Sequence, residues 1–90
     1  MTTKPPPPAA SRQEGEASYF ADAPAGTCAH RTLAMGTEVK VTNLTNGRST
    51  TCRITTRGPY VEGRILDLST AGFTEIASVS AGVVRVRLEW

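Results

Sequence analysis

The sequence predicts a mainly β fold, a small closed barrel of short strands with one short helix. Apolar and polar residues alternate with a period of two at 38–42 and 84–90, as in half-buried strands. Asn46-Gly47, a pair typical of tight hairpin turns, separates the first of these segments from a β-branched run. Frequent glycine between short apolar runs favours a closed barrel, which has no exposed edge, over an open sheet. Periodicity does not give the strand order.

The chain is long enough for one domain, and its first part is too rich in proline to join a core. Pro5 to Pro8 are consecutive, and such a run forms an extended helix without internal hydrogen bonds. We expect residues 1–14 to be a Pro-rich disordered linker or tail, either a plain terminal segment or a tether. Residues 15–90 are expected to form the barrel domain. A core of this size is only marginally stabilising, so such a domain usually needs a further stabilising element such as a cross-link.

The first half of the domain is expected to contain a short strand and a hairpin. The strand is predicted at 16–20, and residues 38–56 are predicted to form a β-hairpin with Val39 and Val41 facing the core. Arg57-Gly58-Pro59 must end the hairpin, because proline cannot donate a hydrogen bond to a neighbouring strand.

The second half is expected to add a strand, a helix and a closing strand. Residues 65–68 form a second short apolar run, and Ser69 or Thr70 is suited to cap a following helix. That helix carries its apolar residues on one face: Phe73, Ile76 and Ala77. The alternating segment 84–90 then closes the barrel.

Charge and hydropathy argue against two classes of partner. The formal net charge is +2, and Lys and Arg are spread along the chain rather than clustered, so we expect no nucleic-acid partner. No run of about 20 apolar residues is present, so we expect no membrane span. The first residues lack the apolar segment of a signal peptide, whereas the cysteine pair and the Pro-rich lead fit an exported protein. We expect either that the export signal lies upstream of Met1 or that the chain is a C-terminal piece of a longer protein.

Five segments resemble those of rare lipoprotein A domains, in the same order and over essentially all of residues 15–90. They are GEASY (15–19), AHRTLAMGT (29–37), VKVTNLTNGRS (39–49), RGPY (57–60) and GRILDLS (63–69). The last segment is also similar to the H-F-D-L-S motif of expansins. Each segment alone is a weak signal, whereas the ordered set is specific.

The resemblance implies a six-stranded double-psi β-barrel in a protein exported to the cell envelope. Characterised members of that family are lytic transglycosylases, which cleave the glycan strands of peptidoglycan, whereas expansins loosen wall polysaccharides without hydrolysis. The fold therefore does not settle the activity. We expect an extracellular or cell-envelope monomer with peptidoglycan glycan strands as its partner.

Asp67 is the first candidate for a catalytic group. Cleaving a glycosidic bond requires a carboxylic acid that protonates the leaving oxygen. Asp67 lies between two leucines, so on a strand it points to the opposite face from both, and it matches the aspartate of both family motifs. The alternative is a structural role, in which Asp67 caps the helix near Ser69 or accepts backbone hydrogen bonds.

His30, the only histidine, is the second catalytic candidate because it aligns with the family's A-H pair. It is expected to position the sugar or tune Asp67, in one open cleft that presents both side chains. A hydrogen-bonded loop residue is the alternative. A single histidine without a cysteine or carboxylate cluster does not make a metal site, so we expect neither metal nor cofactor.

The sequence departs from the family where a second acidic group is expected. Thr56 stands where the family has a catalytic aspartate, and a hydroxyl cannot act as a general acid near neutral pH. A further acidic segment of the family is missing, and only Asp22 lies in the region that bridges the gap. The resemblance thus implies a lytic transglycosylase with impaired catalysis or, as the alternative, a non-catalytic polysaccharide-binding module like expansins. A domain that binds a protein partner is a third hypothesis.

Five residues are expected to contact substrate around that cleft: Tyr19, Thr56, Arg57, Tyr60 and Arg64. Arginine can pair with the lactyl or stem-peptide carboxylates of peptidoglycan, and tyrosine can stack on a sugar face. The alternative is that the arginines are solvated and the tyrosines packed.

Cys28 and Cys52 are expected to form the cross-link that stabilises the small core. A disulfide that closes a loop of this length stabilises a domain by about 3 kcal/mol. The alternative is a pair of reduced, buried thiols. We expect the disulfide because it fits an exported protein.

Overall fold

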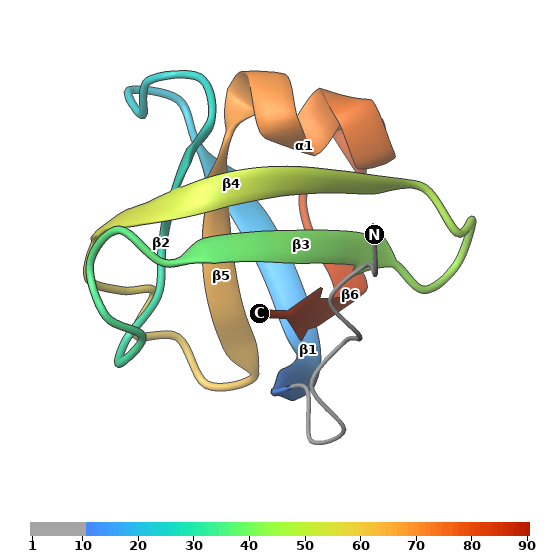
Figure 1. Ribbon diagram of the computed structural model, residues 1–90. Helices are drawn as coiled ribbons and strands as arrows, with labels where there is room; N and C mark the ends of the chain where they lie inside the picture. Colours follow the sequence, from blue (N-terminus) through green and yellow to red (C-terminus); the bar gives the residue numbers. More distant parts are fainter. Residues whose placement is uncertain (1–10) are drawn as a thin grey trace, which may run out of the picture.

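The computed structural model describes residues 11–90 and shows a closed barrel of six strands with one α-helix (Figure 1). The strands are β1 (Arg12–Phe20), β2 (Thr27–Ala29), β3 (Glu38–Asn43), β4 (Ser49–Thr56), β5 (Arg64–Ser69) and β6 (Val84–Glu89). The helix is α1 (Thr70–Ile76), followed by the 3-10 turn η1 (Val79–Ala81).

Around the barrel the strands follow the order β1-β5-β2-β4-β3-β6. β1 runs parallel to β5 and β2 parallel to β4, while the other neighbours are antiparallel. This arrangement confirms the predicted double-psi β-barrel.

The barrel interior is filled by inward-facing residues of the strands and by two residues of α1. Twelve apolar residues are at most 3% exposed: Ala17, Cys28, Val39, Val41, Cys52, Ile54, Leu66, Leu68, Phe73, Ile76, Val86 and Leu88. The alternating pattern therefore sets the two faces of each strand, with Asp67 outside between Leu66 and Leu68.

The predicted hairpin is present as β3 and β4. Their pairing runs from Glu38↔Arg53 to Thr42↔Ser49. Only Gly47 of the turn has a positive φ, at 78°, so Asn46 does not share the left-handed conformation that the pair allows. Instead, the Asn46 side chain donates a hydrogen bond to the backbone oxygen of Ile76 at 3.0 Å and ties the turn to the end of α1.

The first strand differs from the prediction at its start. β1 begins at Arg12, and Gln13 pairs with Leu88 of β6, so residues 12–14 belong to the barrel rather than to the linker. Gly15 is required here because a Cβ atom would lie 2.8 Å from Cγ2 of Ile65 on the neighbouring strand. The Pro-rich segment up to residue 10 lies outside the described residues.

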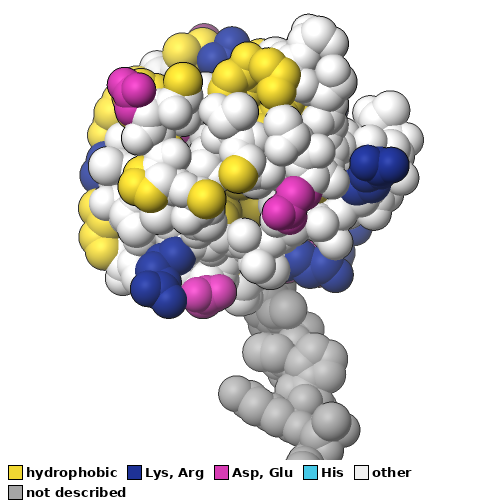
Figure 2. Space-filling model, turned by 90° about the horizontal axis from the view of Figure 1, so that it is seen from above, with side chains coloured by type: hydrophobic (Ala, Val, Ile, Leu, Met, Phe, Trp, Pro, Cys, Tyr) yellow, Lys and Arg dark blue, Asp and Glu magenta, His cyan; other side chains and the backbone are white. Residues whose placement is uncertain are grey.

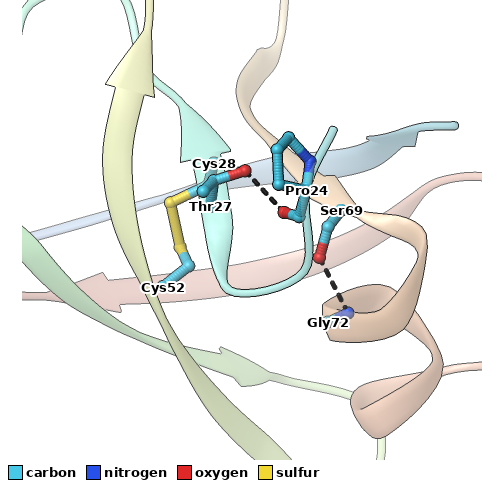
Figure 3. The surroundings of a disulfide bond; sticks show 6 residues. All are labelled: Pro24, Thr27, Cys28, Cys52, Ser69 and Gly72. Carbon is cyan, nitrogen blue, oxygen red and sulfur yellow. Dashed lines mark hydrogen bonds between the residues drawn. A yellow bond between two sulfur atoms is a disulfide. The ribbon is translucent and has the colours of Figure 1, made fainter. Parts of the chain in front are cut away.

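The predicted disulfide between Cys28 and Cys52 is confirmed and joins β2 to β4 (Figure 3). The two Cα atoms are 5.8 Å apart, and the cysteines are separated by 24 positions in the sequence. Figure 3 also shows Ser69 at the start of α1, where its hydroxyl accepts a hydrogen bond from the Gly72 backbone at 3.1 Å. This confirms Ser69 as the helix cap.

The end of the barrel that carries α1 presents apolar side chains scattered between separate basic and acidic ones (Figure 2). No block of like charge covers this face (Figure 2). Over residues 11–90, no helix has the length and hydropathy that crossing a bilayer requires.

Candidate functional site

Asp67 lies on the outer face of β5, opposite Ser18 of the parallel strand β1. The Ser18 hydroxyl donates a hydrogen bond to Oδ1 of Asp67, which fixes the orientation of the carboxylate. Oδ2 makes no hydrogen bond within the described part of the chain. A partly exposed carboxyl group with one free oxygen can donate and accept a proton at a ligand.

A pocket of about 280 Å³ opens at Asp67, and we call it the Asp67 pocket. It is lined by Phe20, Ala23, Cys28, Ala29, Thr56, Arg57 and Asp67. Within residues 11–90, Asp67 is the only carboxylate in this lining. Asp22, adjacent to Ala23, is not part of this lining. It therefore does not replace the aspartate that the family has at the position of Thr56.

Phe20 gives the Asp67 pocket an apolar wall that the sequence did not reveal. Its side chain is 56% exposed at the end of β1, and Ala23 and Ala29 line the pocket with it. An exposed aromatic ring beside a carboxylate is suited to contact the apolar face of a ring-shaped ligand. The pairing of β1 with β5 brings Phe20 here, because Phe20 follows Ser18 by two positions on β1 and therefore projects from the same face of the strand.

Arg57 lines the Asp67 pocket, but its guanidinium donates hydrogen bonds to the neighbouring loop. Its Nη1 atom donates to the backbone oxygen of His30 at 3.2 Å and to that of Leu33. The guanidinium thus holds the segment after β2 in place. Both partners are uncharged carbonyls, and over residues 11–90 Arg57 forms no ion pair.

The His30 ring is only 5% exposed and is held by three hydrogen bonds. Nδ1 accepts from the backbone nitrogens of Thr32 and Leu33, both at 3.1 Å, and Nε2 lies 2.8 Å from Oε1 of Gln13. Since Nδ1 is an acceptor, Nε2 carries the proton. Burial, followed by the charges of Arg57 and Arg31, lowers the pKa of His30 below its usual value of 6.5.

His30 therefore does not share a pocket with Asp67, in contrast to the single cleft expected from the sequence. It lines a second pocket of about 210 Å³, which we call the Arg64 pocket. This pocket is lined by Gln13, His30, Arg31, Thr32, Arg64 and Ile65. The ring nitrogens face Gln13 and the loop backbone, which leaves the imidazole no free atom for a ligand at Asp67.

Neither tyrosine is among the residues that line the Asp67 pocket or the Arg64 pocket. Tyr19 packs its ring against Phe73 of α1, with the ring centroids 4.9 Å apart, and its hydroxyl lies 3.5 Å from the backbone oxygen of Val79. Tyr60 is 74% exposed, and the Arg31 guanidinium lies 6.0 Å from its ring centroid. Tyr19 is thus a packing residue, while Tyr60 lies on the loop after β4.

The neutral state of His30 predicts that the barrel loses stability below pH 6.5. Because the folded pKa lies lower, acid protonates His30 in the unfolded chain before the folded one and favours unfolding. The free energy of unfolding should therefore fall as the pH drops from 6.5 towards the folded pKa. Denaturant titrations at a series of pH values measure this slope.

His30→Asn is the matched variant, because its side-chain oxygen can still accept from the Thr32 and Leu33 backbone while it cannot titrate. As the sequence holds one histidine, the slope near pH 6 should be much flatter in this variant. Equal slopes in the two proteins would show that the imidazole is not held neutral.

Comparison with known proteins adds to this geometry. A family model described as "Lytic transglycolase" matches residues 12–88. The probable endolytic peptidoglycan transglycosylase RlpA of Nostoc sp. is 49% identical over 63 residues, which cover 70% of this chain and 17% of that protein. The endolytic peptidoglycan transglycosylase RlpA of Vibrio cholerae is 51% identical over 63 residues, which cover 70% of this chain and 24% of that protein. The chain thus spans less than a quarter of the length of these relatives.

Solved structures share the fold, among them the following two. A mutant expansin of Clavibacter michiganensis in complex with cellohexaose has a TM-score of 0.70 and 17% identity, over 87% of this chain and 49% of that one. The Streptomyces papain inhibitor has a TM-score of 0.69 and 20% identity, over 88% of this chain and 93% of that one. At these identities the likeness establishes the barrel alone.

Proposed function

Because this chain belongs to the lytic transglycolase family, we propose that it acts on the glycan strands of peptidoglycan, with the Asp67 pocket as its site. The observation that carries the proposal is a partly exposed carboxylate that Ser18 orients at a pocket with an apolar wall. In this proposal the domain works as a monomer outside the cytoplasm, where its disulfide persists.

The proposed reaction is a lytic transglycosylation in which one carboxyl group serves twice. The protonated Asp67 side chain gives its proton to the glycosidic oxygen as the bond from that oxygen to the anomeric carbon breaks. The resulting carboxylate then takes the proton from the sugar's own C6 hydroxyl as that oxygen bonds to the anomeric carbon. The product is a 1,6-anhydro sugar, and water does not take part.

The remaining side chains of the Asp67 pocket support this scheme through shape rather than through chemistry. Phe20 offers an aromatic surface to a sugar ring, and Thr56 offers a hydroxyl. Thr56 carries no charge and cannot stabilise a developing oxocarbenium ion as a carboxylate would. We therefore propose a slow enzyme.

A second candidate function is glycan binding without cleavage, as in an expansin-like module. It is favoured by one observation, the single carboxylate in the lining of the Asp67 pocket. Both candidates require a glycan at the same place, and product formation separates them.

Chemical-shift mapping with soluble peptidoglycan strands tests where the glycan binds. We expect the largest shifts in the backbone amides of Phe20, Ala29, Thr56 and Asp67. The β3–β6 pairing around Val41 and Leu88 lies on another side of the barrel and is the internal control. Shifts centred on that control region, or no saturable shifts, would exclude the Asp67 pocket as the glycan site.

A further inference from the structure

The lining of the Arg64 pocket holds hydrogen-bond donors that have no partner in the described part of the chain. Nε of Arg64 is buried and has no hydrogen-bond partner in the described part of the chain. Oε1 of Gln13 lies against the His30 ring, and its amide nitrogen makes no hydrogen bond to any other residue in the range 11–90. Nδ1 of His30 already accepts two backbone hydrogen bonds. A buried donor without a partner costs about 1–3 kcal/mol, so a ligand that satisfies it gains binding energy.

The two charged side chains that line this pocket, Arg31 and Arg64, are both basic. Arg31 donates to the backbone oxygens of Pro59 at 2.6 Å and Val61 at 2.9 Å, and it forms no ion pair within the part of the chain that the structure describes. No Asp or Glu is among the lining residues described above. Glu16 is paired with Arg64 across β1 and β5, yet over residues 11–90 the two form no ion pair.

The Arg64 pocket also lies next to the Asp67 pocket. Ile65 lines the first and Asp67 the second, and both project from the outer face of β5. Two residues of a strand span about 7 Å, which is within reach of substituents on a single bound sugar chain.

We propose that the Arg64 pocket is a carboxylate-binding subsite, which takes an acidic substituent of the glycan bound at Asp67. The inference rests on the proposed function and deepens it, because it makes the preferred substrate an acidic glycan. In peptidoglycan the carboxylate comes from the lactyl group of a muramic acid without a stem peptide, or from the stem peptide itself. Arginine is suited to either, because its planar guanidinium pairs with carboxylates through two parallel hydrogen bonds.

Titration with sodium acetate tests the subsite without any glycan. We expect saturable chemical-shift changes at Nε–Hε of Arg64 and at the side-chain amide of Gln13, which Arg64→Gln abolishes. The matched control is Arg48→Gln, which removes the same charge from the exposed β3–β4 turn and should leave the titration unchanged. Shifts that are absent in the wild-type chain, or unaffected by Arg64→Gln, would overturn the subsite.

Binding to three soluble glycans then identifies the source of the carboxylate. The ligands are strands stripped of stem peptides, strands that retain them, and chitin oligosaccharides, which carry no carboxylate. Arg64→Gln should weaken binding to one of the acidic ligands about tenfold and leave the chitin oligosaccharides unaffected, and the ligand affected names the source. An equal loss on all three ligands would contradict the proposal.

One outcome separates the failure of the proposed function from the failure of this inference, and a second variant covers the case in which Arg64→Gln does not fold. If acetate binds at Arg64 while no glycan binds, the proposed function fails and the anion site stands. If Arg64→Gln does not fold, Arg64→Lys retains the charge but loses Nε and the paired donors, and it should show the same selective loss. A lysine variant that binds acetate and acidic glycan as tightly as the wild type would refute the role of the guanidinium.

Discussion

Removal of the disulfide between Cys28 and Cys52 is expected to lower the free energy of unfolding by about 3 kcal/mol, because the bond closes a loop of 24 positions in the unfolded chain. For a domain of this size the loss corresponds to a fall in melting temperature of about 12–24 °C. The effect is a large share of the total, since a core this small is only marginally stabilising. Thermal unfolding of a Cys28→Ser, Cys52→Ser double variant against the oxidised wild type measures it.

The control for this prediction is a reducing agent. It should shift the wild-type melting temperature to that of the double variant and leave the variant itself unchanged. A double variant that melts within a few degrees of the oxidised chain would mean that the barrel alone supplies the stability.

The second large effect is expected for Asp67→Asn, which keeps the size of the side chain but removes its proton chemistry. The release of soluble fragments from purified sacculi should fall by about 10²–10⁴-fold, the usual contribution of a general acid or base. Asparagine can still accept the Ser18 hydrogen bond, so the fold and the shape of the pocket should persist. The matched control is Asp22→Asn, which alters an exposed carboxylate outside the pocket lining and should leave the rate unchanged.

Thr56→Asp is expected to raise the rate of fragment release, whereas Asp67→Asn lowers it. It places a second carboxylate in the lining of the Asp67 pocket, at an exposed position that accommodates a charge. The rate should rise by about one to two orders of magnitude, because a charge can then stabilise the cation formed as the glycosidic bond breaks. A Thr56→Asp variant as slow as the wild type would mean that the missing aspartate is not what limits the rate.

Those parts of the fold that depend on neighbouring residues could be predicted from the sequence. Val39 and Val41 alternate with polar residues, and Gly47 lies in a short turn, so the hairpin is encoded locally. β2, with only three residues from Thr27 to Ala29, is too short for any period to be visible. Its position in the barrel depends on its partners β4 and β5, which are remote in sequence.

Only part of the site could be predicted from the sequence, because its other contacts join residues that are remote in the chain. The alternation around Asp67 placed it on the outer face, but its partner Ser18 is 49 positions away and meets it only because β1 and β5 pair in parallel. The His30 side chain instead accepts hydrogen bonds from the backbone of Thr32 and Leu33. A motif match does not distinguish this local contact from a catalytic arrangement. The residues of the Arg64 pocket come from three separate segments, which no spacing in the sequence brings together.

Mass spectrometry of the fragments that the wild-type chain releases from purified sacculi tests the central claim most directly, because it reports how the glycosidic bond was broken. A carboxyl group that acts as acid and then as base, without water, predicts fragments with 1,6-anhydro ends, which are lighter by one water than hydrolysed ends. Fragments with hydrolysed ends, or a chain that binds sacculi and releases none, would contradict lytic cleavage at Asp67.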